Sequence, residues 1–275
     1  MKLRTKIMAI VSLLVTTSIA IAGSDKNNHE LTDTDIYTLL SVGTPGSSHF
    51  GGYIQLGSEA TIDGNIGSRV NYQLGSNVVI DGNVDGGTPV SISPSAMVYG
   101  SYDVKPDAYW SQIYNELSDA SSVAAAYSGT NLGSINSSQI FYASSKGISV
   151  FNINGSINLG GYDSITLIGD ANDTFIINVS GNLTLGSGTA ILLEGVEADQ
   201  VLFNFTGGGF TNTATIGAAI LSGTYLAPDM YWQIGDGATM NATNIWASGI
   251  QGNIQTIYGT GLSADLVKRI FFEAN

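Results

Sequence analysis

LGSEATIDGN at residues 56–65 is followed by LGSNVVIDGN at residues 74–83, with Leu, Gly, Ser, Ile, Asp, Gly and Asn in the same order. Repeats at a short fixed period are typical of solenoids, in which each coil of chain stacks on the preceding coil. The β-branched residues before each DGN favour a strand, and Asp, Gly and Asn favour a tight turn. The stretch therefore predicts one coil of a β-solenoid.

Looser copies of this pattern support coils of 18 to 26 residues: LGSGTAILLEGV begins at Leu185, IGDGATMNATNI at Ile234, and GSINLG at Gly155 is echoed by GNLTLG at Gly181. This length fits a right-handed β-solenoid whose strands stack about 4.8 Å apart. Ile62 would then lie over Ile80 in the interior, while Asp63 and Asp81 would repeat at a corner. A β-sandwich with similar hairpins is the alternative fold.

One segment, residues 105–127, departs from the strand pattern. Its apolar residues recur at steps of three and four, and Pro106 and Asp107 suit a first helical turn. We expect one amphipathic helix packed along the side of the solenoid. The predicted contact stripe is Trp110, Ile113, Tyr114, Leu117, Ala120 and Ala124.

The N-terminus has the features of a secretion signal. Lys2, Arg4 and Lys6 precede an apolar run, and AIA at residues 20–22 fits a cleavage site. We expect a signal peptide over 1–22, a flexible segment over 23–34, a solenoid domain over 35–261 and a short tail over 262–275 that could be helical. The sequence thus predicts a secreted or cell-surface protein without a membrane span after signal removal.

The composition limits the classes of partner and of stabilising bond. The chain has no Cys, which excludes disulfides and thiolate metal sites. Removing the three basic residues of the signal peptide changes the net charge from −13 to −16. A surface this acidic repels the phosphates of nucleic acids and of anionic lipids. We therefore expect no nucleic-acid partner.

The residues available for catalysis are few. A Ser-His-Asp triad would have to use His29 or His49, and both lie in polar segments typical of solvated loops. A β-helical polysaccharide lyase would need a basic residue beside acidic Ca²⁺ ligands, but Arg69, Lys105 and Lys146 are scattered. We expect no enzymatic activity and no cofactor.

Asp63, Asp81 and Asp85 raise the question of calcium, because stacked corners could bring carboxylates together. The tandem GGxGxD pattern of calcium-binding β-rolls is absent from the sequence. Turn formation alone accounts for DGN. We predict no metal site, with Ca²⁺ at the DGN turns as the open alternative.

Three segments resemble the successive motifs of the choice-of-anchor A domain, an adhesive domain of bacterial surface and secreted proteins: FIINVSG from Phe175, VLFNF from Val201 and GTYLAP from Gly223. The likeness covers residues 35–258. The arrangement is also similar to bacterial ice-binding proteins, in NDTFI from Asn172 and GSGTA from Gly186. These resemblances imply adhesion to an extracellular surface, matrix protein or glycan, with ice binding as the alternative.

Each of these functions points to its own candidate residues. An adhesive site would use exposed aromatic rings, which can stack on sugars or pack on extended polypeptide. The candidates are Tyr225, Tyr231, Trp232 and Trp246, unless these rings fill the core or the helix contact. An ice-binding site would use a hydroxyl row on one strand face, which the period of two in TNTAT predicts. The candidates are Thr211, Thr213 and Thr215, although Thr is also an ordinary strand residue.

Overall fold

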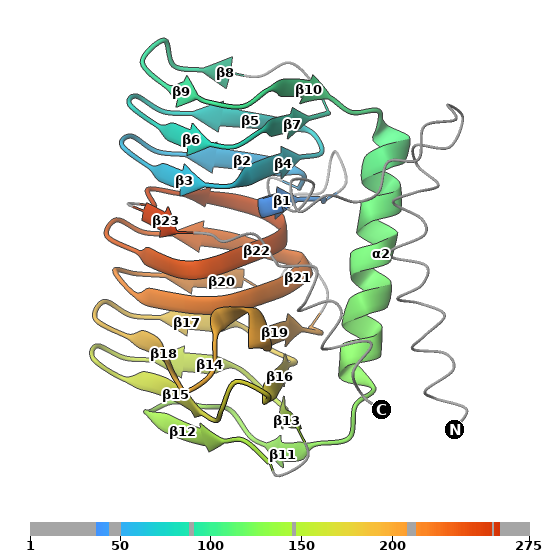
Figure 1. Cartoon of the computed structure of the whole chain (residues 1–275), viewed down its shortest axis with the longest axis vertical. Coiled ribbons are helices and arrows are strands. Elements are labelled where there is room, and N and C mark those ends of the chain that lie inside the picture. The colour runs from blue at the N-terminus through green and yellow to red at the C-terminus, as the bar shows by residue number, and fades with distance from the viewer. Residues whose placement is uncertain are drawn as a thin grey trace.

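The computed structural model describes residues 37–43, 51–87, 91–144, 147–207, 213–254 and 256–258. The expected signal peptide, the segment 23–34 and the tail 262–275 lie outside these residues. Within them, parallel strands stack into successive coils, and one α-helix runs along the side of the stack (Figure 1). The predicted β-solenoid with a packed helix is confirmed, and the β-sandwich is wrong.

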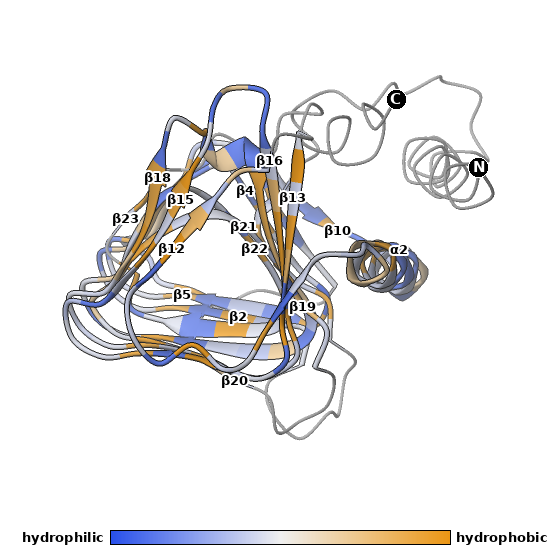
Figure 2. Cartoon of the chain, turned by 90° about the horizontal axis from the view of Figure 1, so that it is seen from below, coloured by the Kyte–Doolittle hydropathy of each residue, from blue (hydrophilic) through white to orange (hydrophobic). Residues whose placement is uncertain are grey.

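Seen along its axis, the solenoid has a triangular outline with an apolar interior, and helix α2 (Asp107–Ala125) lies outside one side of the triangle (Figure 2). We call this side the helix face and the other two the amide face and the mixed face. The long strands β21 (Ile220–Ile234) and β22 (Thr239–Gly252) turn two corners each and contribute to all three faces.

The remaining strands divide among the three faces. The helix face holds β11 (Thr130–Leu132), β13 (Ile148–Ile153), β16 (Thr174–Val179), β19 (Val201–Phe205), β1 (Tyr37–Ser41), β4 (Asn65–Ser68), β7 (Val84–Gly86) and β10 (Tyr102–Val104), with the 3₁₀ turn η2 (Ala198–Gln200) before β19. The amide face holds β14 (Ile157–Leu159), β17 (Leu183–Leu185), β20 (Thr213–Ile216), β2 (Tyr53–Leu56), β5 (Asn71–Leu74) and β8 (Ser91–Ile92). The mixed face holds β12 (Gln139–Tyr142), β15 (Ser164–Ile168), β18 (Ala190–Glu194), β23 (Thr256–Tyr258), β3 (Thr61–Asp63), β6 (Val79–Asp81) and β9 (Met97–Val98).

The 18-residue repeat sets the strand register. Ile62 of β3 pairs with Ile80 of β6, and both side chains are fully buried in the solenoid interior. Asp63 pairs with Asp81, and both carboxylates are exposed. The 26-residue echo behaves in the same way, because it brings β14 into register with β17. Equivalent positions of the repeats therefore stack, as the sequence predicts.

The Asn that ends each DGN connects one coil to the next. The side-chain Oδ1 of Asn65 accepts a hydrogen bond from the backbone N–H of Asn83 at 2.8 Å. Oδ1 of Asn83 accepts one in turn from the backbone N–H of Ser101 at 2.9 Å. Backbone N–H groups at a corner have no strand partner, and an unpaired polar group near the core is costly. Because the Asn recurs in each copy, its side chain supplies a hydrogen-bond acceptor for a backbone N–H at each of these successive corners.

The glycine of the repeated LGS lies where two coils approach most closely. A Cβ at Gly75 would come within 2.7 Å of the carbonyl oxygen of Gly57, its counterpart one coil away. Backbone atoms cannot move aside for such a contact, so a residue with a side chain would force the coils apart. This close approach explains why Leu-Gly recurs at the start of each copy.

The first described strand, β1, lies in the middle of the stack rather than at an end. β1 pairs with β4 on one side and with β22 on the other, and β2 and β3 lie between two neighbours in the same way. Coils from β1 to β10 build one half, α2 returns along the stack, and coils from β11 to β23 build the other half (Figure 1). We call the contact of β22 and β23 with β1, β2 and β3 the seam.

The apolar stripe of α2 faces the solenoid, as predicted. Trp110, Leu117 and Ala124 are buried, and Ile113 and Tyr114 are partly buried in the same cluster. The solenoid side of this cluster includes Ile176, Leu202 and Leu226, which point outward from the helix face. The helix runs from Asp107 to Ala125, within the expected range of 105–127.

A row of Asn side chains on the helix face holds the C-terminal part of α2. Asn178 donates from Nδ2 to the carbonyl oxygen of Ala124 at 3.0 Å, and Asn204 donates to that of Ser121 at 2.9 Å. The row is also linked internally, because Asn204 Nδ2 donates to Asn178 Oδ1 at 2.8 Å. These hydrogen bonds run from side chains of the sheet to carbonyl oxygens of the helix, and they fix the last two turns of α2 on the helix face.

Truncating Leu117 to alanine is expected to lower the free energy of unfolding by roughly 2–5 kcal/mol, because the cavity would lie between two packed surfaces. Chemical denaturation followed by circular dichroism measures this change. Asn115, exposed on the outer side of the same helix, provides the matched control, and Asn115→Ala should change stability by less than about 0.5 kcal/mol. Equal effects of the two substitutions would show that α2 does not depend on this contact.

Candidate functional site

The outward side chains of the amide face form one aligned, uncharged column. Strand register places one such residue from each coil directly over the next, while the alternate residues point into the core. From one end of the stack to the other, the column reads Asn158, Thr184, Thr215, Gln233, Gln251, Gln55, Gln73 and Ser91. Every member carries an amide or a hydroxyl group that is at least partly exposed. We call this set the amide column.

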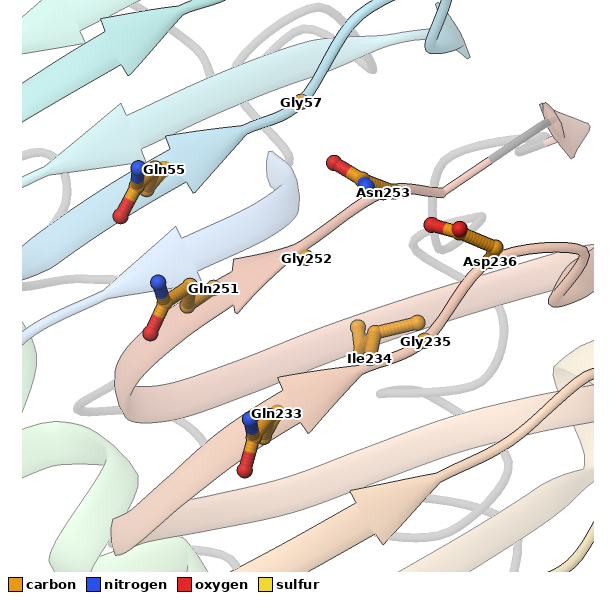
Figure 3. A pocket seen from close by; sticks show the side chains of 9 residues that line it. All are labelled: Gln55, Gly57, Gln233, Ile234, Gly235, Asp236, Gln251, Gly252 and Asn253. Carbon is orange, nitrogen blue, oxygen red and sulfur yellow. The ribbon is translucent and has the colours of Figure 1, made fainter.

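Two tyrosines orient amides of this column. The hydroxyl of Tyr53 donates to Oε1 of Gln73 at 3.1 Å, and the hydroxyl of Tyr231 donates to Oε1 of Gln251. Figure 3 shows Gln55, Gln251 and Gln233 one above another, with their amides on the same side of the sheet. Because the carbonyl oxygen of Gln251 is engaged by Tyr231, its two N–H donors are the groups left for other partners.

A shallow depression of about 220 Å³ lies beside the amide column, across the seam. Its rim has amides of the column on one side and Asp236 and Asn253 on the other (Figure 3). Gly57, Gly235 and Gly252 also line it, together with Ile234, whose side chain is only 2% exposed. A Cβ at Gly57 would lie 1.4 Å from Oδ1 of Asn253. The glycine is thus required for Asn253 to keep its place.

Two of the four predicted aromatic residues are not at the surface. Tyr225 and Trp232 are 1% and 0% exposed, with ring centroids 5.2 Å apart in an edge-to-face contact inside the solenoid. Tyr225 also stacks on Phe203 at 5.0 Å. The expectation of exposed rings is wrong for both, because the alternation of β21 turns Trp232 inward with Ile234, and Tyr225 inward with its neighbours in the core.

The other two aromatic residues lie in different surroundings. Tyr231 is partly exposed on the amide face, where it contacts Gln251. Trp246 is partly buried in the cluster beneath α2, and its indole N–H donates to the carbonyl oxygen of Tyr37 at 2.9 Å. The structure therefore separates the four residues and leaves only Tyr231 beside the amide column.

Two of the three threonines predicted for ice binding lie on this face as well. Thr211 is outside the described residues, and Thr213 and Thr215 lie on β20. Thr213 pairs with Tyr231, so one residue of the predicted ice-binding set lies beside one residue of the predicted adhesive set. Thr215 is exposed, and Thr184 on the neighbouring coil continues the row of hydroxyl groups. The next positions of the column on either side are Asn158 and Gln233. The hydroxyl row is therefore two coils long here.

The sequence prediction missed the amides and several exposed rings. The amides have a visible signal, since YIQLG at 53–57, NYQLG at 71–75 and YWQIG at 231–235 place Gln at a fixed offset before the repeated glycine. The exposed rings have weaker signals in the sequence. Tyr162 is 91% exposed at a corner with a left-handed φ of 68°, and Tyr99, Tyr102 and Tyr142 are also exposed.

The mixed face carries small hydroxyl and methyl groups in a second uncharged column. Its register places Ser164, Ala190, Ile220, Thr239, Thr256, Thr61 and Val79 one over another. Ile140 and Leu192 are exposed beside this column. The exposed carboxylates of Asp63 and Asp81 lie on the same face beyond the seam. The strands of the mixed face from β15 to β18 carry one exposed carboxylate, that of Glu194, while β3 and β6 carry two.

The buried and paired charges of the described chain gather where α2 begins. Arg69 donates to Asp107 Oδ1 and to Ser111 Oγ, both at 2.8 Å. Asp85 accepts from the Tyr37 hydroxyl and lies 3.6 Å from Lys105 Nζ. Burial raises the pKa of Asp85, against the opposing effects of the Tyr37 hydrogen bond and the Lys105 charge. These contacts join the helix to the solenoid and lie away from the amide column.

The described part of the chain contains neither a metal centre nor a membrane-spanning helix. His29 and His49 fall outside it, and no group of three His, Asp or Glu side chains within it is placed to hold a metal ion. None of its helices is long and apolar enough to cross a membrane.

Comparison with known proteins gives a consistent architecture. A family model described as "Putative Ice-binding-like adhesive domain" matches residues 15–256. The fold is similar to an ice-binding protein of the Antarctic ascomycete Antarctomyces psychrotrophicus, with 18% identity, a TM-score of 0.53, and coverage of 78% of this chain and 96% of that one. An ice-binding protein from an Arctic yeast gives 16% identity, a TM-score of 0.55, and 83% and 92% coverage.

A bacterial structure agrees with these two. The DUF3494 domain of a Shewanella frigidimarina ice-binding protein is 17% identical, with a TM-score of 0.52 and coverage of 84% of this chain and 97% of that domain. No curated protein matches the chain in sequence. At these identities, the solved structures support the fold and leave the ligand to be argued from the surface of this chain.

Proposed function

Because the chain belongs to the family of ice-binding-like adhesive domains, we propose that it is a secreted, non-catalytic domain that attaches to an extended extracellular surface through its amide face. The observation that carries this proposal is the amide column, which runs uncharged across the coils of a chain with a net charge of −13. A rigid stack of strands presents the same kind of group at regular intervals, and such an array suits a repetitive ligand.

The distribution of charge supports binding without catalysis. In the described chain, Arg69 and Lys105 pair with carboxylates at the start of α2. General acid–base catalysis needs a positioned proton donor or acceptor at the ligand. Of the residues that line the depression, Asp236 is the single ionisable one, and the members of the amide column carry none. The amide face is therefore equipped to hold a ligand by hydrogen bonds and shape.

Ice binding is a second candidate, favoured by the mixed face. From β15 to β22 its outward column consists of Ser164, Ala190, Ile220 and Thr239, which carry small hydroxyl and methyl groups. A flat array of such groups can order water in a way that long, flexible amide side chains cannot. The two candidate functions thus use different faces, and one experiment can separate them.

Substituting one threonine on each face by arginine tests both candidates. We expect Thr215→Arg on the amide face to reduce attachment of chain-coated beads at least tenfold, because a bulky charge interrupts the column. Thr239→Arg on the mixed face is the matched control and should leave attachment unchanged. Attachment is counted on surfaces coated with a neutral polysaccharide, with a matrix protein, or left as bare glass.

Thermal hysteresis of the same proteins gives the other readout. Hysteresis in the wild-type chain that Thr239→Arg removes and Thr215→Arg preserves would establish ice binding in place of adhesion. Failure of the wild-type chain to attach to any of the three surfaces would contradict the adhesive function. Circular dichroism of both variants verifies that each is folded.

A further inference from the structure

We propose that the depression across the seam binds an uncharged, hydroxyl-rich glycan chain through the amides of Gln55, Gln233 and Gln251. This inference rests on the proposed adhesive function and names the chemical class of its ligand. It follows from the shape of the depression, the chemistry of its rim, its charge and its position in the amide column.

The depression has the form of a short open trough. The amides of Gln55, Gln251 and Gln233 stand along one side of it, and Asp236 and Asn253 stand on the other (Figure 3). Between them lie Gly57, Gly235 and Gly252, together with Ile234, whose side chain is only 2% exposed. A sugar ring can approach glycine residues closely while polar groups on both sides reach the hydroxyls at its edge.

The rim matches the hydrogen-bonding needs of sugar hydroxyls. Each hydroxyl is both a donor and an acceptor, and a primary amide offers two donors and a carbonyl acceptor. Gln251 is held by the hydroxyl of Tyr231 at its carbonyl oxygen, so its N–H donors are presented without a further loss of side-chain freedom. Asp236 can accept hydrogen bonds from hydroxyls on the opposite side of the trough.

The charge of the site selects against anionic glycans. No Lys, Arg or His is among the nine residues that line the depression, and one of the nine, Asp236, is acidic. The whole chain is strongly negative, so sulfated or carboxylated polymers would be repelled over a distance of about 10 Å at moderate salt. A neutral glycan forms the same hydrogen bonds without this repulsion.

The surroundings of the depression favour a polymer over a single sugar. The amide column continues from Gln233 to Thr215 on one side and from Gln55 to Gln73 on the other. Neighbouring coils present these groups about 4.8 Å apart along the solenoid axis. A chain that lies along this axis gains contacts with each additional unit, and many weak contacts add up to firm attachment.

A protein partner fits this surface less well. Stable protein interfaces are centred on buried aromatic and aliphatic side chains. Within the described residues, the large apolar side chains that are exposed do not line the depression: they are Met97, Tyr99, Tyr102, Val104, Ile140, Tyr142, Tyr162, Leu192 and Ile220. The strand edges of the amide face are paired on both sides at the seam, so no edge is free to accept an added strand there.

The test measures affinity for a soluble neutral polysaccharide, hydroxyethyl cellulose, by retardation of the protein in native gels that contain the polymer. We expect retardation of the wild-type chain and at least a tenfold loss of affinity in the double variant Gln55→Ala/Gln233→Ala. The matched control, Thr61→Ala/Thr256→Ala, removes two polar groups from the mixed face, away from the amide column. Its affinity should remain within twofold of wild type.

Several results would overturn the inference. A wild-type chain that is not retarded by hydroxyethyl cellulose but attaches to the protein-coated surface would exclude a neutral glycan and leave the adhesive function standing. Full affinity in Gln55→Ala/Gln233→Ala would place the ligand elsewhere on the chain. Equally strong retardation by alginate, a carboxylated polysaccharide, would contradict the selection against anionic polymers.

Discussion

Ile80→Asp is expected to prevent folding of the purified chain, with loss of the β-type circular dichroism spectrum. Ile80 is fully buried and stacks on Ile62 of the neighbouring coil. A carboxylate at this position would lose its hydration, and the paired cations Arg69 and Lys105 belong to the helix face. Burial of an unpaired charge costs on the order of several kcal/mol, which is comparable to the total stability of many domains.

Two controls test whether the stacking register causes this effect. Thr61→Asp adds the same carboxylate at an exposed position of the adjacent strand β3, and Asp81→Asn changes an exposed corner next to Ile80. Both should change the free energy of unfolding by less than about 0.5 kcal/mol. A folded Ile80→Asp protein with the stability of these controls would refute the 18-residue register.

Trp232→Ala should lower the free energy of unfolding by roughly 3–5 kcal/mol, because it removes a large side chain from the centre of the solenoid. The ring packs edge-on against Tyr225 and Phe205, and it is 0% exposed. Its indole N–H has no hydrogen-bond partner among the described residues, so truncation leaves no acceptor unpaired. The loss therefore comes from packing, and denaturant titration followed by circular dichroism measures it.

Truncation of an exposed ring provides the comparison. Tyr99 is 68% exposed on the mixed-face side of the stack, and Tyr99→Ala should leave stability within about 0.5 kcal/mol of wild type. If Trp232→Ala were instead as stable as wild type and impaired only attachment, the ring would act at the surface, as expected for an adhesive site built on exposed rings.

The stacking of coils could be predicted because its signal is local. Residues 56–65 and 74–83 carry the same polar and apolar order, so their register follows from alignment of the two copies. The helix was also predictable, since its apolar residues follow a period that no strand shares. Both features depend on short stretches of chain and not on which distant segments meet.

The aromatic residues show which positions strand alternation can assign to the interior and which it cannot. Trp232 lies two residues before Ile234, the residue aligned with the repeated Leu, and the alternation of a strand turns both inward. That signal was present in the sequence. Tyr225 and Trp246 lie on the helix face, where both sides of the sheet are covered, so alternation cannot separate surface from interior there.

The depression was not predictable from the sequence. Gly57 comes from the first half of the chain and Asn253 from the second, and they meet because the seam joins β2 to β22. Neither segment shows by itself that it will border the other. The amides that form the rim do follow a pattern, but the trough arises from a contact between segments far apart in the sequence.

Because the chain returns along the stack through α2, the length of this helix must match the height of the stack. Its 19 residues span about 28 Å at 1.5 Å per residue. The helix face from β11 to β10 rises roughly 43 Å at about 4.8 Å per strand. The segments before Asp107 and after Ala125 cover the rest, so little length is spare.

This match in length couples the number of coils to the number of helical turns, two properties that would vary independently in a solenoid without a returning helix. A variant with one more coil at either end would need about three more helical residues, close to one turn, to bring the chain back in register. Natural relatives of this chain should therefore gain or lose coils together with turns of the helix. Helix length in a sequence would then indicate how long a binding surface the protein presents.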